Sequence, residues 1–449
     1  MEELISITYD SILIGTDTPT SILAAALSRD GEKILHIDRS SYYGSIDGTL
    51  AFHEFLSLAS SGDSPTFREF CIHIMPNEDE ECMKFPRRFN IDLQPKFVYS
   101  VGDVVDWTVN CGVSLYLEFK PLEAGVIWDK NGIRRVPCNK SEIFANEALS
   151  VVEKRLLMKF IEFCSKSIEE GNFDVNVRFV DVMAEKKLPQ HLQNILLYAI
   201  LLIEDTNVSF AEALSRMEKY VSSLGIYKDN CALLYPMYGS SDIPQGFCRM
   251  CAVYEGTYVI TDELAIEDVC EIDGLQVVTS SFGPLRGKKV FVNSVYASLD
   301  KQVTIELENS SFRAAILCRG IIKEAEGPVL FSIPPMEFGN ASVVYVLQLG
   351  ESSSTVPAGY SMLHVWTAEG NADIIQSFIA SVPVEIVFLA TYKHTVVRCS
   401  GTLNHVYNPG GYEILKHFVH AKELFNKEKG NHEFLPLRHT EEEDVLKDI

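Results

Sequence analysis

The sequence predicts an α/β fold: a doubly wound sheet domain that continues into a mixed or antiparallel sheet and contains an inserted small all-helical domain. Three observations predict it. The chain opens on a strand–helix–strand pattern, its middle repeats apolar residues at helical spacing, and its second half changes to a period of two. Alternating strands and helices favour a parallel sheet, whereas runs with a period of two favour an antiparallel one.

Residues 9–38 carry the strand–helix–strand pattern. Residues 9–15 (Tyr-Asp-Ser-Ile-Leu-Ile-Gly) are typical of a buried parallel strand, and the stretch from Ser21 to Arg29 follows as a helix. Glu32 to Asp38 is a second apolar strand that ends in an acid. Because parallel strands need a crossover connection, this order predicts a βαβ unit.

The middle of the chain predicts three consecutive helices. Residues 147–171 repeat apolar side chains every three or four positions, which places them on one helix face: Leu149, Val152, Leu156, Phe160 and Phe163. Residues 189–203 and 209–224 follow as a second and a third helix, and Gly171 and Gly225 stand where the first and third end. We therefore expect a helical domain over residues 137–224.

The remainder predicts β-structure and one closing helix. From about residue 257 the pattern alternates, with short runs at 302–307, 312–318, 343–349, 360–366 and 384–391. Residues 404–425 predict a strand, a Pro-Gly-Gly turn and a helix. The expected organisation is one discontinuous domain, residues 1–136 and 225–430, around the helical insert, followed by a polar tail over 431–449.

The first turn stands where a dinucleotide fingerprint would lie, but it departs from that pattern. The fingerprint G-x-G-x-x-G uses its second glycine for close approach of the backbone to a pyrophosphate. Here the turn reads Gly15-Thr16-Asp17-Thr18-Pro19-Thr20, so a carboxylate stands at the second glycine and a threonine at the third. We expect no bound flavin or nicotinamide. Asp38 is either the ribose ligand of such a site or a structural acid at the strand end, and the altered turn favours the second.

Composition excludes several other classes of function. The formal net charge of −23 disfavours nucleic-acid binding, and its clusters, such as 78–81 and 441–444, are typical of solvated segments. Eleven dispersed cysteines and no evident secretory signal predict a cytosolic protein. Cys248 and Cys251 form a single C-x-x-C, which predicts two buried thiols and no metal site. The longest apolar run, Ile195 to Ile203, is too short to span a bilayer.

Three ordered motifs resemble the superfamily of Rab GDP-dissociation inhibitors and Rab escort proteins. They are residues 9–16 continued by 34–44 (ILHIDRSSYYG), residues 88–93 (RFNIDL), and residues 234–239 (LYPMYG) continued by 243–258. The resemblance covers most of residues 5–260 and, more weakly, the C-terminal helix. It implies a flavoprotein-like fold that persists without flavin. Residues 136–160 and 247–254 resemble the escort branch, while the length of the chain favours the inhibitors.

The resemblance implies a non-catalytic accessory protein. An escort binds GDP-bound, unprenylated Rab GTPases, presents them to the Rab geranylgeranyltransferase heterodimer and chaperones the geranylgeranylated product during transient membrane contact. The Rab-binding residues that it implies are Tyr42, Tyr43, Arg88, Asp242, Gln245, Arg249 and Tyr258. The family has a glutamate at Asp242 and a glycine at Glu255, so the contacts there differ. Arg249 either contacts Rab or forms an ion pair with Asp242 that braces its own loop.

The helical insert resembles the part of the family that docks on the transferase and lies near the lipid. Phe179 aligns with a docking phenylalanine, with ordinary helix packing as the alternative. The lipid is expected between helices that carry Leu197, Leu201, Met217 and Val221, although an apolar stripe at this spacing is also typical of plain core. Two other functions remain open: a Rab GDP-dissociation inhibitor and, more remotely, a flavin-dependent oxidoreductase.

Overall fold

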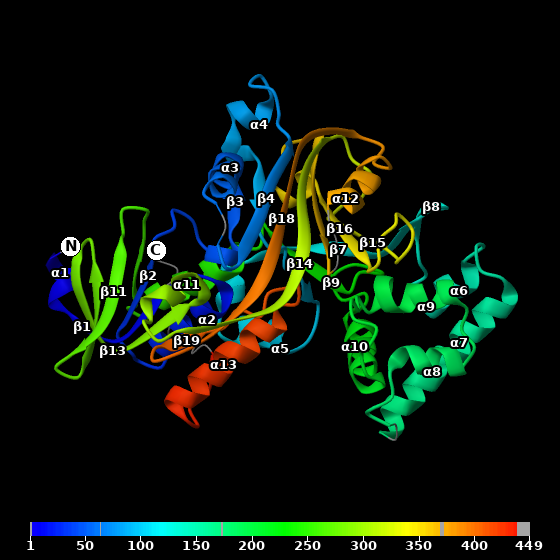
Figure 1. The fold of residues 1–449 in the computed structure, drawn as a ribbon. Helices are drawn as coiled ribbons and strands as arrows, with labels where there is room; N and C mark the ends of the chain where they lie inside the picture. The colour runs from blue at the N-terminus through cyan, green and yellow to red at the C-terminus, as the bar shows by residue number, and fades with distance from the viewer. Residues whose placement is uncertain (1, 63, 172–173, 369–371, 438–449) are drawn as a thin grey trace.

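The computed structural model describes residues 2–62, 64–171, 174–368 and 372–437. Figure 1 shows three lobes: one at the left that holds the N-terminal strands, an upper one built on long strands, and a helical one at the lower right. Most of the predicted polar tail, residues 438–449 with the acidic run 441–444, lies outside the described residues.

The first lobe is a seven-stranded sheet, as far as the described residues show. Its strands are parallel from β10 to β13, while β11 and β12 form an antiparallel extension. In sheet order they are β10 (Thr257–Ile260), β2 (Ile34–Asp38), β1 (Thr8–Ile14), β13 (Gly283–Asn293), β12 (Leu275–Ser280) and β11 (Ile266–Ile272), with β19 (Asn404–Val406) on β13.

Three helices pack together on this sheet: α2 (Thr18–Arg29), α11 (Asp242–Val253) and α13 (Leu415–Lys429). Their apolar sides form one core with Leu13, Phe247 and Phe418. Shorter elements complete the lobe: α1 (Glu2–Ser6), η1 (Ser45–Asp47), α5 (Asp103–Asn110), η3 (Val113–Tyr116) and η5 (Ser294–Leu299). The doubly wound architecture therefore follows from the apolar strands and the helices that cover them.

The upper lobe is a ten-stranded sheet within the described ranges, antiparallel except where β15 meets β7. In order its strands are β4 (Phe67–Ile74), β18 (Glu385–Ser400), β14 (Thr304–Arg319), β17 (Tyr360–Thr367), β16 (Val344–Leu349), β15 (Val329–Ile333), β7 (Glu118–Asp129), β9 (Leu233–Met237) and β6 (Val98–Tyr99), with β8 (Gly132–Arg135) on β7.

Short elements surround this sheet. β3 (Thr49–Ala51) and β5 (Asn90–Asp92) form a separate two-stranded ladder. The lobe also carries α3 (Phe52–Ser60), α4 (Glu81–Lys84), η2 (Pro86–Arg88), η6 (Glu351–Ser353) and α12 (Ala372–Ile379).

A long two-stranded ribbon, β14 with β18, connects the two sheets. Each strand has 16 residues, and they pair from Thr304 opposite Ser400 to Arg319 opposite Glu385. At the lower end the Asp300 carboxylate accepts hydrogen bonds from the Leu403 backbone (2.8 Å) and the Thr402 hydroxyl (2.9 Å). Because β18 then continues into β19, which pairs with β13, the ribbon is anchored in both lobes.

The third lobe contains the helices that follow β8 and precede β9. They are α6 (Lys140–Ala145), α7 (Val151–Glu170), α8 (Phe179–Glu185), α9 (Gln190–Asn194), the π-helical segment η4 (Ile195–Ile200) and α10 (Phe210–Ser223). Ser150 and Glu153 form a capping box at the start of α7, and Gly171 ends it in the left-handed region (φ 62°). η4 packs against β7 and β15, which attaches this lobe to the upper sheet.

Several element boundaries differ from the sequence expectations. The helix predicted from Ser21 begins at Thr18, because Asp17 occupies the N-cap position and Pro19 suits the first turn. The runs 302–307 and 312–318 belong to one strand, β14, with an irregular register between them. The expected helix 189–203 is divided between α9 and η4. No helix of the described ranges is long and apolar enough to cross a membrane.

Candidate functional site

The turn between β1 and α2 keeps the close approach of a nucleotide-binding turn but uses it for a protein side chain. Gly15 has a φ of 105°, and a Cβ added to it would lie 2.1 Å from the amide nitrogen of Asn293 on β13. Only glycine fits this position, because a side chain would be strained and would collide with Asn293. The space next to Gly15 is therefore filled by the side chain of Asn293.

Asp17 occupies the N-terminal end of α2, where a phosphate would bind in a nucleotide-binding protein. Its carboxylate is buried, accepts a hydrogen bond from the Thr20 hydroxyl, and accepts a second from the Asn408 amide at 3.0 Å. Burial and the neighbouring Asp47 raise the pKa of Asp17 to about 7. The expected negative charge is therefore only partial at neutral pH, but the side chain and its partners still fill the position.

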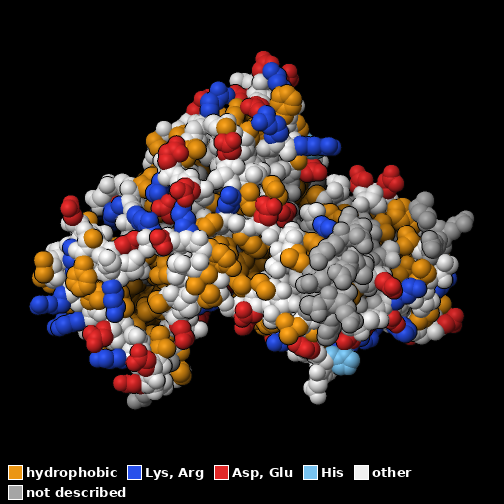
Figure 2. Space-filling view, turned by 180° about the vertical axis from the view of Figure 1, so that it is seen from behind, with side chains coloured by type: hydrophobic (Ala, Val, Ile, Leu, Met, Phe, Trp, Pro, Cys, Tyr) orange, Lys and Arg blue, Asp and Glu red, His pale blue; other side chains and the backbone are white. Residues whose placement is uncertain are grey.

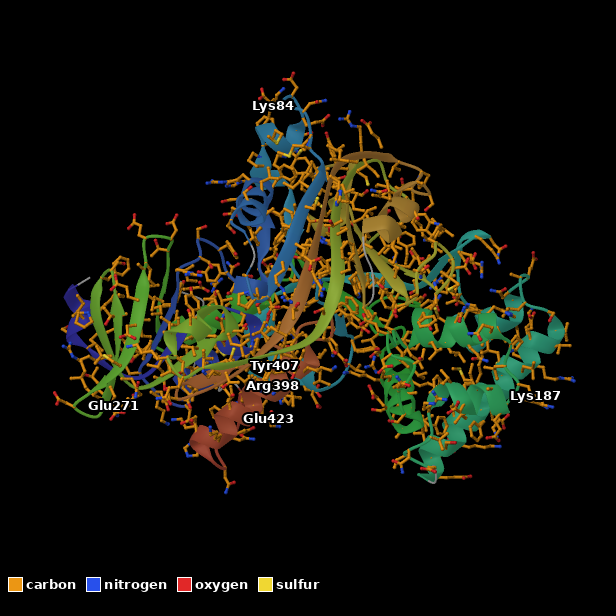
Figure 3. All side chains as sticks on the ribbon, viewed as in Figure 1. Lys84, Lys187, Glu271, Arg398, Tyr407 and Glu423 are labelled. Atoms are coloured by element: carbon orange, nitrogen blue, oxygen red, sulfur yellow. The ribbon has the colours of Figure 1, made fainter. Side chains whose placement is uncertain are left out.

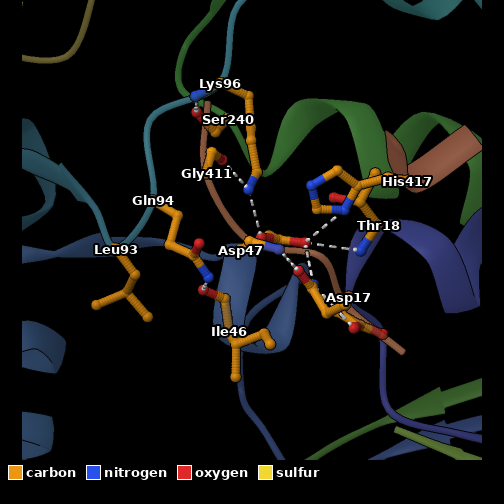
Figure 4. Close-up of polar contacts among 12 residues, drawn as sticks. Asp17, Thr18, Ile46, Asp47, Leu93, Gln94, Lys96, Ser240, Gly411 and His417 are labelled. Carbon is orange, nitrogen blue, oxygen red and sulfur yellow. Dashed lines mark hydrogen bonds and ion pairs between the residues drawn. The ribbon is translucent and has the colours of Figure 1, made fainter. Parts of the chain in front are cut away.

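A buried ion pair lies directly beside Asp17 (Figure 4). Lys96 Nζ is 3.0 Å from Asp47 Oδ1, and neither side chain is exposed. The same ammonium donates to the Gly411 carbonyl at 2.6 Å, while Asp47 Oδ2 accepts from the Thr18 backbone (3.1 Å) and the Asn408 amide (2.8 Å). Burial alone would raise the pKa of Asp47, but the Lys96 charge and these hydrogen bonds lower it below its usual value.

Asp38, at the end of β2, serves the protein alone. Its carboxylate accepts from the Thr16 backbone (2.8 Å), the Thr16 hydroxyl (2.7 Å), the Tyr296 hydroxyl (2.7 Å) and the Ser40 backbone (3.0 Å). A carboxylate has about four acceptor positions, so these donors satisfy it without a ribose. Asp38 is a structural acid. Because the turn is filled and Asp38 is fully hydrogen-bonded within the protein, these residues do not fit a bound dinucleotide.

Two tyrosines from neighbouring segments form an exposed aromatic pair. Tyr43 follows β2 and Tyr258 lies on β10, and their ring centroids are 6.2 Å apart. Tyr258 is 38% exposed, and burial together with the contact to Tyr258 raises the pKa of Tyr43. Tyr42 instead packs inward against the core, where burial and the nearby Asp38 raise its pKa to about 12. Both adjacent tyrosines are half-buried, and Tyr43 is the one that pairs with the exposed Tyr258.

One side of α11 carries three further predicted residues. Asp242, Gln245 and Arg249 are spaced three and four residues apart and reach solvent. Burial and the carboxylates of Asp92 and Glu118 raise the pKa of Asp242 to about 7. We call this set, together with the Tyr43–Tyr258 pair, the α11 surface.

Arg249 does not form an ion pair with Asp242, which was one of the two alternatives for its role. In the part of the chain that the structure describes, Arg249 has no ion pair, and its guanidinium lies over the Tyr116 ring at 4.3 Å from the centroid. That stacking orients Arg249 while leaving its donors accessible. Leu115, 67% exposed, borders the same place. Sequence reasoning missed Leu115 and Tyr116, because no local pattern relates η3 to a helix more than a hundred residues later.

The opposite side of α11 carries Cys248 and Cys251, which face α2 and the core. Burial raises the pKa of Cys248 to about 12 and that of Cys251 to about 11. They are therefore inert buried thiols, as predicted. The helix ends in a Schellman motif, in which Glu255 N–H donates to Ala252 O (3.1 Å) and Gly256 N–H to Cys251 O (2.8 Å). Glu255 has a φ of 64°, in the region that favours glycine.

Arg88 lies outside the α11 surface. It ends η2 and forms a close ion pair with Glu81 of α4, near the tip of the upper lobe that Lys84 marks in Figure 3. No described contact joins it to the Tyr43–Tyr258 pair or to α11. The Rab-binding role of Arg88 therefore stays a prediction, at a place apart from the α11 surface.

Phe179, predicted to dock on the transferase, is a core residue. Its exposed fraction is 0%, and its ring lies between Phe160 (centroids 5.9 Å apart) and Phe210 (6.2 Å, nearly parallel). A side chain without exposed area has nothing to offer a partner protein. The structure therefore corrects the docking role to helix packing, which was the alternative.

The four residues expected to hold lipid are not on one open surface. Leu197, Leu201 and Met217 are at most 7% exposed and belong to the large core between the helical lobe and the upper sheet. Val221 is 60% exposed at the end of α10. In this conformation the first three are ordinary core contacts, so a lipid could lie among them only after the packed elements separate.

The comparisons with known proteins decide the family. A family model described as GDP dissociation inhibitor matches residues 1–433. The chain belongs to the GDP dissociation inhibitor family. The resemblance inferred from the three motifs is thereby confirmed.

Curated relatives within the family carry escort and inhibitor names. Rab proteins geranylgeranyltransferase component A from Drosophila melanogaster is 27% identical, over 98% of this chain and 92% of its own length. Rab escort protein 1 from Arabidopsis thaliana is 27% identical, over 81% and 77%. The Rab GDP-dissociation inhibitor of Saccharomyces cerevisiae is 25% identical, over 93% of both chains.

Solved structures confirm the predicted fold. Rab GDI from Plasmodium falciparum superposes with a TM-score of 0.74 at 20% identity, covering 96% of this chain and 99% of that one. An oxidoreductase from Methanosarcina mazei gives a TM-score of 0.54 at 9% identity, covering 93% and 100%. Identities this low show architecture only. The GDP dissociation inhibitor family thus shares its scaffold with oxidoreductases, and in this member the nucleotide turn is filled.

Proposed function

We propose that this protein is a Rab escort protein. It binds GDP-bound, unprenylated Rab GTPases, presents them to the Rab geranylgeranyltransferase heterodimer as a non-catalytic accessory subunit, and carries the geranylgeranylated product to membranes. It works from the cytosol and contacts membranes transiently. The observation that carries the proposal is the α11 surface on a scaffold whose nucleotide turn is filled by Asp17, Asp47 and Lys96.

The α11 surface has the composition of a protein interface. Tyrosine and arginine dominate binding hot spots because they bury large areas and keep a polar group. Tyr43, Tyr258 and Arg249 supply these side chains, and Tyr116 holds Arg249 in place. Asp242 and Gln245 add polar groups at the border. We assign Rab binding to the discontinuous domain, residues 1–136 and 225–430, and transferase docking and lipid shielding to residues 137–224.

The deciding experiment is a prenylation reaction with Rab–GDP, geranylgeranyl diphosphate and the purified transferase heterodimer, with and without this protein. We expect lipidated Rab only when the protein is present. Arg249→Ala and Tyr43→Ala should each weaken Rab binding at least about tenfold, in the range of interface hot spots. Arg286→Ala is the matched control, because Arg286 is exposed on β13 and outside the α11 surface.

The second candidate is a Rab GDP-dissociation inhibitor, favoured by the relative from Saccharomyces cerevisiae that aligns over 93% of both chains. An inhibitor would extract prenylated Rab–GDP from membranes but would not support lipidation by the transferase. The two functions therefore separate in the same reaction. A protein that binds neither form of Rab and purifies with a stoichiometric flavin absorbance would instead be an oxidoreductase, against the geometry at Asp17.

A further inference from the structure

A polar cavity of about 1020 Å³ lies between the helical lobe and the upper sheet. The loop before α10 and the helix itself form one wall, strands β14, β17 and β18 form a second, and the Pro409-Gly410-Gly411 turn closes it. Small-molecule sites have volumes of about 300–1,000 Å³, so the cavity is large enough for such a ligand. It is separate from the α11 surface.

Arg313 of β14 is the unusual residue of this cavity. Its side chain lines the cavity although the residue is only 5% exposed, and its Nε donates to the Ser311 hydroxyl at 3.1 Å. Over the described ranges no carboxylate lies within ion-pair distance of it. An arginine stays charged in proteins, and buried charges are normally paired. The guanidinium is therefore suited to bind an anion that enters the cavity.

The entrance to the cavity carries charges of both signs, Arg216 and Lys416 beside Glu212 and Glu413. A groove between α10 and α13 shares Arg216, Glu413 and Lys416 with the cavity. Arg216 is paired with Glu212 at 3.1 Å, whereas Lys416 is exposed and has no ion pair among the described residues. Figure 2 shows the molecule hollowed between two lower lobes, and Figure 3 places Tyr407, Arg398 and Glu423 beside α13 along this groove.

Aromatic side chains supply the rest of the recognition surface. Trp366, Tyr412 and Tyr198 line the cavity, and the Trp366 indole N–H donates to Glu204 at 3.0 Å. Burial raises the pKa of Glu204, while the Trp366 hydrogen bond and the nearby charges of Arg313, Arg216 and Lys416 act in the opposite direction. Such walls suit a flat ring. A C20 isoprenoid has no group that could pair with Arg313, so the cavity differs in chemistry from a lipid site.

We propose that this cavity binds a small aromatic organic anion whose carboxylate or phosphate pairs with Arg313, with Lys416 assisting at the entrance. The ring lies beside Trp366 and Tyr412, and Glu204, which is bonded to Trp366, is a hydrogen-bond acceptor in the same wall. This site is independent of the Rab-binding proposal, because its residues take no part in the α11 surface.

The test is calorimetric titration of the full-length protein with 2-naphthoate and with its neutral isostere 2-naphthamide. We expect one saturable site for the carboxylate and binding of the amide at least about tenfold weaker, because each tenfold corresponds to about 1.4 kcal/mol of lost charge pairing. Inorganic phosphate that competes with naphthoate would assign the phosphate class, and phosphate without effect would assign the carboxylate class. Equal binding of acid and amide, or no saturable binding, would overturn the proposal.

Variants locate the site. Arg313→Gln should weaken naphthoate binding at least about tenfold, and Lys416→Ala about two- to fivefold, as expected for a buried and an exposed charge. Lys427→Ala, an exposed lysine on the same helix α13 but away from the cavity, should leave binding unchanged. Unchanged binding in a folded Arg313→Gln protein contradicts the assignment. If that variant does not fold, the comparison of Lys416→Ala with Lys427→Ala tests the site, because both lysines are exposed on α13. Equal naphthoate affinity of these two variants would contradict binding in the cavity.

Discussion

Lys96 and Asp47 form an ion pair at 3.0 Å in which both side chains are fully buried, next to a turn that in related folds holds a diphosphate. The pair comes from segments about fifty residues apart, and the Asn408 amide donates both to Asp47 and to Asp17. These buried side chains occupy the place where the diphosphate of a ligand would otherwise lie. The network therefore fills this position with the protein's own side chains.

The first prediction concerns this pair. Lys96→Met should lower the free energy of unfolding by about 3–5 kcal/mol, because it leaves the Asp47 charge buried without its partner. The double variant Asp47→Asn with Lys96→Met should recover much of that loss, and chemical denaturation measures both. Lys301→Met, which removes the exposed pair with Asp268, is the control and should change stability by less than about 1 kcal/mol. Additive effects of the two buried substitutions would contradict the assignment.

The second prediction is a pH dependence caused by Asp17. Its pKa is raised to about 7 in the folded protein, so between about pH 4 and pH 7 the folded state binds more protons than the unfolded state. The contribution of this group to stability is therefore present at low pH and is lost as pH rises through 7. Asp17→Asn removes the ionisation. From pH 5 to pH 8 the variant should gain about 2–3 kcal/mol relative to the unsubstituted protein.

Only the slope with pH tests the role of Asp17, because the amide also changes the hydrogen bonds with Thr20 and Asn408 by a constant amount. Denaturation curves recorded at several pH values give that slope. Parallel stability profiles for the two proteins would show that Asp17 titrates normally and is not buried as described.

The third prediction concerns Glu255, whose φ of 64° ends α11 in a conformation suited to glycine. Glu255→Gly should raise the free energy of unfolding by about 1 kcal/mol. A residue with a side chain in the left-handed conformation costs roughly 1–2 kcal/mol, and the greater flexibility of glycine in the unfolded chain offsets part of the gain from removing that cost. Glu263→Gly, exposed and without a positive φ, should destabilise slightly. Thermal unfolding that shifts downward for both variants would refute the strain.

The fourth prediction separates packing from docking at Phe179. Phe179→Ala should lower stability by about 3–5 kcal/mol, because the ring is fully buried between Phe160 and Phe210. Val152→Ala, at a 68% exposed position on α7, should cost less than about 0.5 kcal/mol. If Phe179→Ala unfolds like the parent protein but fails to support transferase binding, the original docking expectation was right.

Much of this fold was predictable from the sequence because its signals are local. The βαβ opening, the helical period of α7 and the alternation of β14 each reflect neighbours along the chain. The predicted apolar face of α7 was only partly right, because the buried face runs through Leu157, Phe160 and Cys164 while Val152 is exposed. The altered turn was equally readable, since Asp17 stands within it. Asp47, Lys96 and Asn408 were not predicted. They come from three separate segments, which reach the turn that holds Asp17 only in the folded protein.

The candidate site likewise contains residues that the sequence predicted and residues that it did not. Tyr43, Tyr258 and the exposed side of α11 were identified from motifs; Tyr43 and Tyr258 contact each other, and Gln245 and Arg249 are exposed on α11. Arg88 pairs with Glu81 and Phe179 is fully buried, and the sequence predicted neither environment, because a motif states which residue is present but not which way it faces. Arg313 gave no signal at all, since an arginine in an alternating strand is usually exposed and only the packed sheet shows that it is buried.

The ribbon of β14 and β18 has a consequence for communication between sites. Its two strands pair from the upper sheet to the junction with β19, with two irregularities in the register, so a rotation of one lobe against the other has to distort this ladder. Occupancy of the cavity and association at α11 should then be energetically additive: each ligand leaves the affinity for the other unaltered, and the molecule reports two separate equilibria.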